Sequence, residues 1–139
     1  RQILRSSART DPVKFKKSKI KATAITKAQK SINDIYVDEK VEEYILNLVF
    51  STRNPEDYNL GDLSQLIENG ASPRASISLI LASKARAFLE GRGYITPEDV
   101  RFIGKDVLRH RIILSYEAEA EEISSEDIIQ RMFDSIEIP

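Results

Sequence analysis

The clearest hydrophobic pattern in the chain lies between residues 38 and 51. Its apolar side chains recur at the spacing i, i+3, i+4, i+7 and i+8, which places them on one face of an α-helix; they are Val41, Tyr44, Ile45, Leu48 and Val49. Asp38 precedes them as a preferred N-cap residue, and Asn54-Pro55 follows as a stop signal. We therefore predict a half-buried helix that begins after Asp38.

The longest helical segment follows Gly70 and ends before Gly91-Arg92-Gly93, and a short helical turn around residues 62–67 precedes it. We expect this long helix to be the central one, because its many small side chains let neighbouring helices approach closely. It carries Ile77, Ile80, Leu81, Lys84, Ala85 and Phe88, with Ala75, Leu79, Ala82 and Leu89 widening the apolar surface.

Other helices are predicted from their start signals. Thr26 is expected to cap a helix that reaches about Ile35, Thr96 to cap one with acidic residues in its first turn, and Ser124 or Ser125 to cap the last one. The β-branched run within residues 109–116 suits one short extended segment, and the acidic stretch 117–122 is expected to be solvated. The sequence thus predicts an all-α bundle of five or six helices with at most one short extended segment.

The N-terminal segment differs from the rest in pattern and charge. Residues 10–23 carry many lysines without an apolar period and are predicted to be a linker. The net charge is +9 over residues 1–30, −3 over residues 31–116 and −7 over residues 117–139. We interpret the basic stretch at residues 14–21 as a solvated linker, or a face against an acidic protein, in preference to a nucleic-acid contact. Because the chain begins at Arg1 without methionine, we expect a fragment of a longer protein.

Composition excludes several kinds of site. The 139 residues include no cysteine and one histidine, which excludes thiol chemistry, cysteine–zinc sites and histidine clusters. That residue, His110, has no nucleophile motif near it and is expected to be a hydrogen-bonded structural histidine, and the carboxylates give no metal-site pattern. No apolar run has the length of a membrane span and no signal peptide pattern is present, so we expect a cytoplasmic protein.

One helix start remains as candidate chemistry. Gly70-Ala71 leads into Ser72, expected to be the N-cap, then Pro73 at the first helical position and Arg74 at the second. Free N–H groups, the positive end of the helix dipole and a guanidinium all favour a bound anion there. The alternative is an exposed arginine on a well-capped structural helix. The chain has no GxxxxGK[ST] loop and no GxGxxG, so it is not a complete P-loop ATPase.

Five segments together carry a family resemblance. The segments occur in the same order as in the C-terminal lid of AAA+ ATPases, specifically of the MoxR family, which the chain resembles over about residues 25–116. The acidic stretch and the last helix fit this pattern more loosely. The matching segments are residues 37–45, 51–53, 70–76, 93–100 and 107–112.

The resemblance implies a role for the helix start. Arg74 would be the sensor 2 arginine, reaching the γ-phosphate of ATP that is bound with Mg²⁺ in an AAA+ core domain, and Ser72 and Pro73 would flank it in the nucleotide site. The Walker motifs would lie in that core, so these residues alone are expected to be inactive. The implied boundaries are residues 1–24 for the end of the core and the hinge, and 25–139 for the lid.

The resemblance also implies partners. Proteins of this family are chaperone-like ATPases that form homo-oligomeric rings, commonly hexamers, and act with proteins containing a von Willebrand factor type A domain. Contacts with the chain's own core and with neighbouring subunits are therefore expected, and none with a membrane. The alternative is a helical DNA- or protein-binding module without an ATPase role, and for DNA binding the nearly balanced charge and the lack of a basic recognition helix argue against it.

Overall fold

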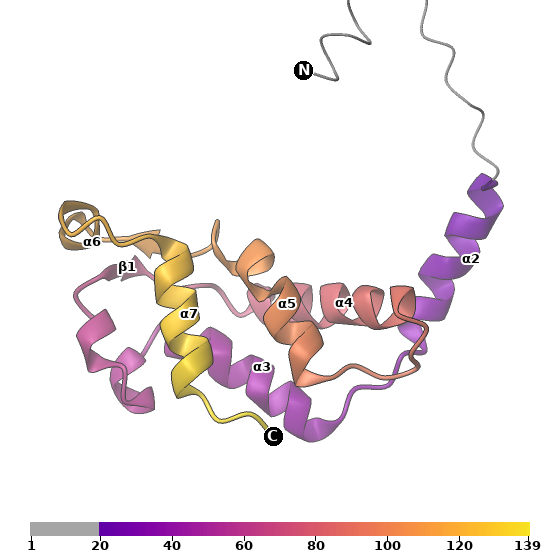
Figure 1. Ribbon diagram of the computed structural model, residues 1–139, viewed down its shortest axis with the longest axis horizontal. Coiled ribbons are helices and arrows are strands. Elements are labelled where there is room, and N and C mark those ends of the chain that lie inside the picture. Colours follow the sequence, from indigo (N-terminus) through magenta and orange to yellow (C-terminus); the bar gives the residue numbers. More distant parts are fainter. Residues whose placement is uncertain (1–19) are drawn as a thin grey trace, which may run out of the picture. The chain divides into compact units, whose positions relative to one another are not determined.

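Figure 1 shows the computed structural model, which describes residues 20–139. This part contains six α-helices: α2 (Ala22–Asn33), α3 (Glu39–Ser51), α4 (Arg74–Leu89), α5 (Pro97–Leu108), α6 (Tyr116–Ala120) and α7 (Ser125–Ser135). It also contains the 3₁₀ helices η1 (Pro55–Tyr58) and η2 (Gly61–Leu63) and the strands β1 (Ile67–Asn69) and β2 (Ile113–Leu114). The predicted all-α class is confirmed.

The chain divides into two compact units after Lys30. The second unit, residues 31–139, contains every element from α3 to α7. Of the first unit the structure describes residues 20–30, which lie mostly in α2. Most of the expected linker at residues 10–23 and most of the basic stretch at residues 14–21 therefore lie outside the described residues.

Helix α3 confirms the apolar face that its sequence predicts. All five expected positions are buried, each with at most 6% of its surface exposed. Asp38 caps the helix as expected, since its carboxylate accepts the Lys40 N–H at 3.0 Å. The spacing of apolar residues alone therefore located both the helix and its buried side.

Helix α4 packs against both α3 and α5, which confirms its central position. Its expected buried side was partly wrong, because Ile77 and Leu81 are 60% and 52% exposed. The residues that face the core are mostly small and follow a different line along the helix: Ala75, Ser76, Leu79, Ser83 and Ala87. Small side chains let α3 and α5 close onto this helix, whereas Ile77 and Leu81 lie on its outer face.

A two-stranded antiparallel sheet joins the segments that precede α4 and follow α5. Ile67 pairs with Leu114 and Asn69 with Ile113. One short extended segment was expected within residues 109–116, and β2 lies there at Ile113–Leu114; its partner begins at Ile67, where a helical turn was expected to end. The sheet thereby connects two segments that lie more than 40 residues apart in the sequence.

The start of α2 differs from the prediction, and the short helix α6 was not predicted. Helix α2 begins at Ala22, so Thr26 lies inside it and donates a hydrogen bond back to the Ala22 carbonyl at 3.3 Å instead of capping. The acidic stretch begins within the short helix α6, where the Ser115 hydroxyl accepts the Ala118 N–H at 3.3 Å. The start of α5 at Thr96 and that of α7 at Ser124 are confirmed.

Candidate functional site

The loop that leads into α4 is fixed to the end of α3. The backbone N–H of Ala71 donates to the Thr52 hydroxyl at 2.8 Å, and that hydroxyl donates to the Val49 carbonyl at 2.6 Å. Thr52 is 1% exposed and Ala71 is fully buried. A Cβ at Gly70 would lie 2.2 Å from the Thr52 carbonyl oxygen, so only glycine allows this close approach. The segments 51–53 and 70–76, separate in sequence, thus form one unit.

The start of α4 is built differently from the expected cap. Pro73 is the N-cap residue, with φ −55° and ψ −23°, and Arg74 is the first helical residue instead of the second. The Ser72 side chain makes no capping bond, and its carbonyl accepts the Ala75 N–H at 2.7 Å. The Ser76 N–H likewise bonds the Pro73 carbonyl at 3.2 Å, so backbone carbonyls and not the Ser72 hydroxyl satisfy the first-turn N–H groups. The expected N-cap role of Ser72 was therefore wrong.

Helix α4 also lacks the negative groups found at neighbouring helix starts. Helices α3, α5, α6 and α7 each have acidic residues in the first turn, whereas α4 has none. At α5 and α7 a carboxylate accepts the backbone N–H of the N-cap residue, at 2.9 Å in each case. The positive end of the α4 dipole is thus left without a carboxylate from its own first turn.

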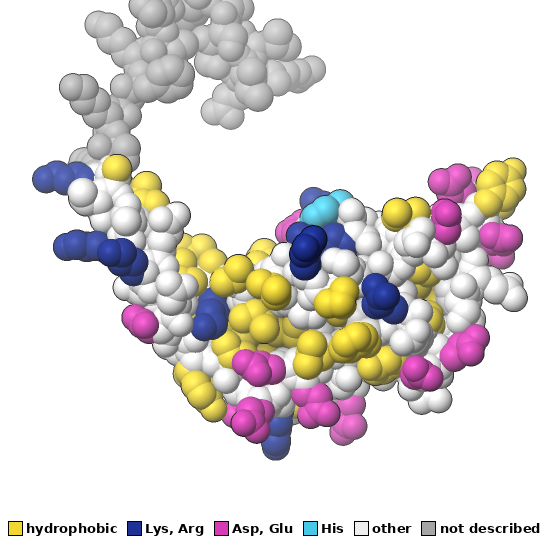
Figure 2. All heavy atoms as spheres, turned by 180° about the vertical axis from the view of Figure 1, so that it is seen from behind, with side chains coloured by type: hydrophobic (Ala, Val, Ile, Leu, Met, Phe, Trp, Pro, Cys, Tyr) yellow, Lys and Arg dark blue, Asp and Glu magenta, His cyan; other side chains and the backbone are white. Residues whose placement is uncertain are grey.

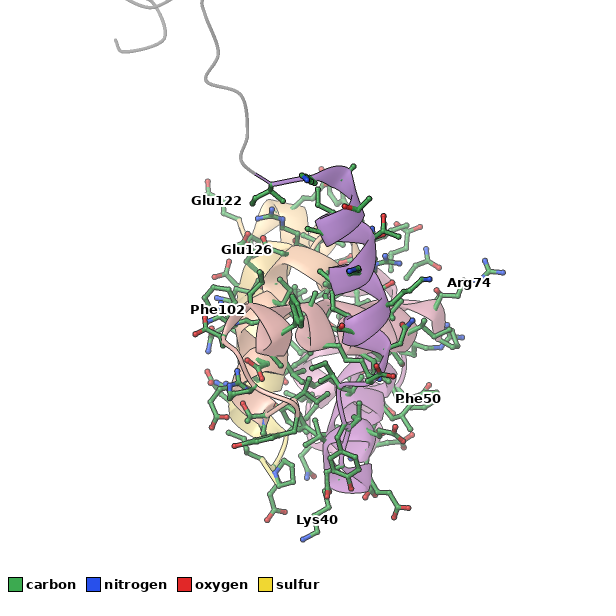
Figure 3. The ribbon with its side chains drawn as sticks, turned by 90° about the vertical axis from the view of Figure 1, so that its right-hand side faces the viewer. Lys40, Phe50, Arg74, Phe102, Glu122 and Glu126 are labelled. Carbon is green, nitrogen blue, oxygen red and sulfur yellow. The ribbon has the colours of Figure 1, made fainter. Side chains whose placement is uncertain are left out.

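Arg74 is exposed and points away from the body of the domain, as Figure 3 shows. Its guanidinium has no hydrogen-bond or ion-pair partner among the described residues. Most other described arginines are paired with carboxylates, namely Arg86, Arg92, Arg101, Arg109 and Arg131. Within residues 20–139, Arg53, Arg74 and Arg111 have no carboxylate partner. Arg74 is therefore free to bind an anion from outside this domain.

A hydrophobic surface lies on the same side of the domain as Arg74. Figure 3 shows Phe50 of α3 and Arg74 of α4 on one side, and Figure 2 shows many hydrophobic side chains gathered on this face. Exposed apolar side chains of these two helices are Leu46 and Phe50 on α3, and Ile77 and Leu81 on α4. Because α3 and α4 pack together, the outer face of the pair is partly apolar.

A polar pocket of about 300 Å³ lies beside the same loop, but Arg74 is not part of it. It is lined by Thr52, Arg53, Asn54, Pro55, Glu56, Asp57, Ser64, Ile67, Glu68 and Gly70. Three carboxylates against one arginine make this pocket unfavourable for a phosphate. We therefore place the candidate anion site at Arg74 and not in the pocket.

The remaining candidate chemistry is limited. His110 is exposed and has no hydrogen-bond partner in the described part, so the expected hydrogen-bonded structural histidine was wrong. Among residues 20–139, no cluster of three or more His, Asp or Glu side chains could hold a metal ion. No helix of this part has the length and apolar character that a membrane crossing needs.

Sequence reasoning missed two residues that shape the candidate site. Thr52 lies in the matching segment 51–53 and was given no role. Its position next to a buried helix end was a signal, because a threonine hydroxyl there can accept an N–H group of a loop. Arg111 also lay in such a segment, and its side chain donates to the Ser78 hydroxyl of α4 at 3.2 Å. Nothing in the local pattern could have located that contact, because it spans 33 residues.

Comparison with known proteins identifies the domain. The AAA lid domain family matches residues 62–132, which run from η2 through the candidate site and α5 into α7. The chain belongs to the AAA lid domain family. This match covers about half of the chain and includes Arg74, Ser78 and Arg111.

Individual relatives of this lid domain carry the MoxR name. Chaperone MoxR1 of Mycobacterium tuberculosis is 40% identical over 104 residues, which are 75% of this chain and 28% of that protein. Protein MoxR of Paracoccus denitrificans is 36% identical over 105 residues, 71% of this chain and 31% of that protein. The lid domain is therefore that of a MoxR-family AAA+ ATPase, and the resemblance found in the sequence is confirmed.

A solved structure agrees with this assignment. The crystal structure of a proposed ATPase from Cytophaga hutchinsonii matches 99% of this chain with a TM-score of 0.89 and 36% sequence identity. The match covers 42% of that protein, and the chain spans less than a third of the length of the curated MoxR relatives. The lid domain thus corresponds to a minor part of larger proteins.

Proposed function

We propose that Arg74 is the sensor 2 arginine of a MoxR-type ATPase and contacts the γ-phosphate of ATP. The observation that carries this proposal is an exposed guanidinium without any partner in residues 20–139, at a helix start without an acidic residue. Phosphate is the anion that a guanidinium and a helix N-terminus both favour. Ser72 and Pro73 would flank the phosphate, with the Ser72 hydroxyl free because it makes no capping bond.

The lid would supply one wall of a nucleotide site whose other walls belong to an AAA+ core domain. That core would bind Mg²⁺ and the remaining phosphate oxygens, and no Walker motif is present in these 139 residues. Phosphoryl transfer depends mainly on positioning and charge stabilisation. An arginine that meets the γ-phosphate before hydrolysis and loses it afterwards makes different contacts in the two states, which is what coupling to lid motion requires.

The partly apolar face of α3 and α4 supports the same arrangement. Arg74 can reach a nucleotide in the core only if this side of the lid faces the core. Leu46, Phe50, Ile77 and Leu81 would then be covered in the whole protein. We propose that residues 1–24 are the end of the core and the hinge, and that residues 25–139 are the lid.

The assembly would follow that of the family. We propose a cytoplasmic, chaperone-like ATPase that forms a homo-oligomeric ring, a hexamer, and acts with a protein that contains a von Willebrand factor type A domain. The name Chaperone MoxR1 of one relative and the small share of each relative that this chain spans support a larger, chaperone-like protein.

The test is steady-state ATP hydrolysis by the full-length protein with Arg74→Ala. We expect turnover to fall by roughly 10-fold to 1000-fold, as after loss of one preorganised charge contact. Arg53→Ala is the matched control, because Arg53 is also exposed and also lacks a carboxylate partner among the described residues, and it should leave turnover unchanged. Hydrolysis at the wild-type rate in the Arg74→Ala protein would refute the sensor role.

A further inference from the structure

Arg111 is linked to the first turn of α4 by two hydrogen bonds in series. Its Nη2 donates to the Ser78 hydroxyl at 3.2 Å, and that hydroxyl donates to the Arg74 carbonyl at 3.2 Å. Its Nε donates to the Val107 carbonyl at 2.9 Å, which fixes the same guanidinium to the end of α5. The half-buried side chain of Arg111 therefore connects the end of α5, through the Ser78 hydroxyl, to the backbone of Arg74.

The bonding of Arg111 differs from that of Arg109, which lies two residues earlier. Arg109 is exposed and pairs with the carboxylates of Asp106 and Glu126, at 3.1 and 3.2 Å. Arg111 has no carboxylate partner in the described part and directs its donors at a carbonyl and a hydroxyl. A guanidinium offers its N–H groups in a rigid planar fork, so two acceptors on different elements are held at a fixed separation. The Arg111 side chain thus bridges the end of α5 and Ser78 of α4.

From these contacts we propose that Arg111 is a positioning residue for Arg74. The proposal rests on the proposed function, because it assigns Arg111 a role only if Arg74 meets a phosphate. Arg111 donates to one lone pair of the Ser78 hydroxyl, so the hydroxyl proton is directed at the Arg74 carbonyl. The backbone of Arg74 is then held relative to α5.

The adjacent segments strengthen this connection. Strand β1 leads into the loop before α4 and pairs with β2, which begins two residues after Arg111. The Ser115 hydroxyl donates to the Gln65 carbonyl at 2.6 Å, and the Ser115 N–H donates to the Leu66 carbonyl at 3.0 Å. Residues 113–115 thus hold the segment before α4, and Arg111 holds the first turn of α4. A shift of about 1 Å in a group that contacts a transition state can lower a rate by roughly 100-fold, so these contacts matter for catalysis.

The experiment compares ATP hydrolysis by variants of the full-length protein. Arg111→Gln and Ser78→Ala both break the link, and we expect each to lower kcat by roughly 5-fold to 30-fold with KM for ATP changed less than about twofold. Arg111→Lys should retain part of the activity, because an ammonium keeps the charge but cannot span both acceptors. Arg109→Gln is the matched control, with the same substitution in the same segment, and should hydrolyse ATP at the wild-type rate.

The same changes in the Arg74→Ala background separate this inference from the proposed function. If Arg111 acts through Arg74, Arg111→Gln and Ser78→Ala lower kcat no further in that background. An equal further loss there would mean that Arg111 acts independently of Arg74, and the positioning role would be overturned. If Arg74→Ala lowers turnover while Ser78→Ala does not, only the positioning role fails. If Arg74→Ala has no effect, the sensor role itself fails.

Thermal unfolding of each variant excludes a general loss of structure. Ser78→Ala removes one half-buried hydroxyl and should leave the melting temperature within about 3 °C of wild type. It therefore decides the question even if Arg111→Gln unfolds the domain. A wild-type kcat in a folded Ser78→Ala protein contradicts the proposal.

Discussion

The substitution Asp99→Asn is predicted to destabilise the domain far more than a helix-cap change normally does. Asp99 is 2% exposed, and its carboxylate accepts Nη1 and Nη2 of Arg92 at 2.7 and 2.5 Å. The same carboxylate accepts the Thr96 N–H at 2.9 Å and lies 3.7 Å from Nε of Arg86. Asparagine keeps the size of the side chain and removes its charge. The change therefore leaves the Arg92 guanidinium without a carboxylate partner, leaves Arg86 with Glu90 alone, and weakens the start of α5.

The magnitude follows from the burial of the partners. Breaking a fully buried ion pair typically costs about 3–5 kcal/mol of unfolding free energy. Arg86 and Arg92 have 29% and 28% of their side-chain surface exposed, so water partly solvates their charge after the substitution. We therefore expect a loss of about 2–3 kcal/mol. For a domain of this size, that loss lowers Tm by roughly 8–12 °C.

The assay is thermal unfolding followed by circular dichroism, with Asp127→Asn as the matched control. Asp127 occupies the same position in α7, where its carboxylate accepts the Ser124 N–H at 2.9 Å, but it is exposed and has no arginine partner among the described residues. We expect its Tm decrease to be less than a third of that for Asp99→Asn. Equal decreases would show that the contacts of the two arginines with the buried Asp99 carboxylate contribute nothing to stability, contrary to this prediction.

The effect of Asp99 should also depend on pH. Burial by itself raises the pKa of the Asp99 carboxyl, but the hydrogen bonds from Arg92 and Thr96 outweigh it, so that pKa lies below its usual value. A carboxyl whose pKa is lowered by folding stabilises the native state above its unfolded pKa, about 3.9, and loses this contribution as the pH falls through the folded value. The stability difference between wild type and Asp99→Asn should therefore be constant at neutral pH and shrink below about pH 4.

Two further predictions concern the loop before α4 and the isolated chain. Thr52→Val removes the buried acceptor of the Ala71 N–H and should lower the unfolding free energy measured in urea by about 1–3 kcal/mol. Ser51→Ala, which loses only a bond to the Leu48 carbonyl of its own helix, should change it less, and the reverse order would contradict the anchoring role of Thr52. Isothermal titration of the 139-residue chain with ATP should detect no micromolar binding, because the chain has no phosphate-binding loop. A micromolar Kd would refute the proposal that most of the nucleotide site belongs to a separate core domain.

The sequence predicted those elements whose signals are local. Helix α3 was located correctly because its apolar residues recur with a clear helical period. The starts of α5 and α7 were located correctly because each capping box lies within four consecutive residues. The orientation of α4 could not be read in the same way, since apolar residues occur on all sides of it. Its large side chains suggested a buried face, but the face that packs tightly against α3 and α5 consists mostly of small residues.

The candidate site shows the same limit. Arg74 and its helix start could be identified from Gly70 to Arg74 alone, and the resemblance supplied a role for them. The expected Ser72 cap was wrong because the N–H groups of Ala75 and Ser76 bond the Ser72 and Pro73 carbonyls, and none bonds the Ser72 hydroxyl. Thr52 and Arg111 hold this helix start through contacts with residues 19 and 33 positions away, respectively. A local sequence pattern cannot predict contacts over such separations.

At the start of α4 the backbone itself satisfies the N–H groups of Ala75 and Ser76, which bond the Ser72 and Pro73 carbonyls, and no side chain caps the helix. Loss of a cap typically costs about 1 kcal/mol, and at α5 and α7 a carboxylate avoids that cost but also neutralises the positive helix end. At α4 the hydroxyls of Thr52 and Ser78 hold the backbone from either side of the start, and neither carries a charge. The backbone around the start of α4 is thereby fixed, while its positive end has no carboxylate from the first turn and is available to an external phosphate. Because the same contacts connect α4 to α3 and α5, a force on Arg74 would move the three helices together, and we expect nucleotide-dependent motion of the lid to be a rigid-body rotation.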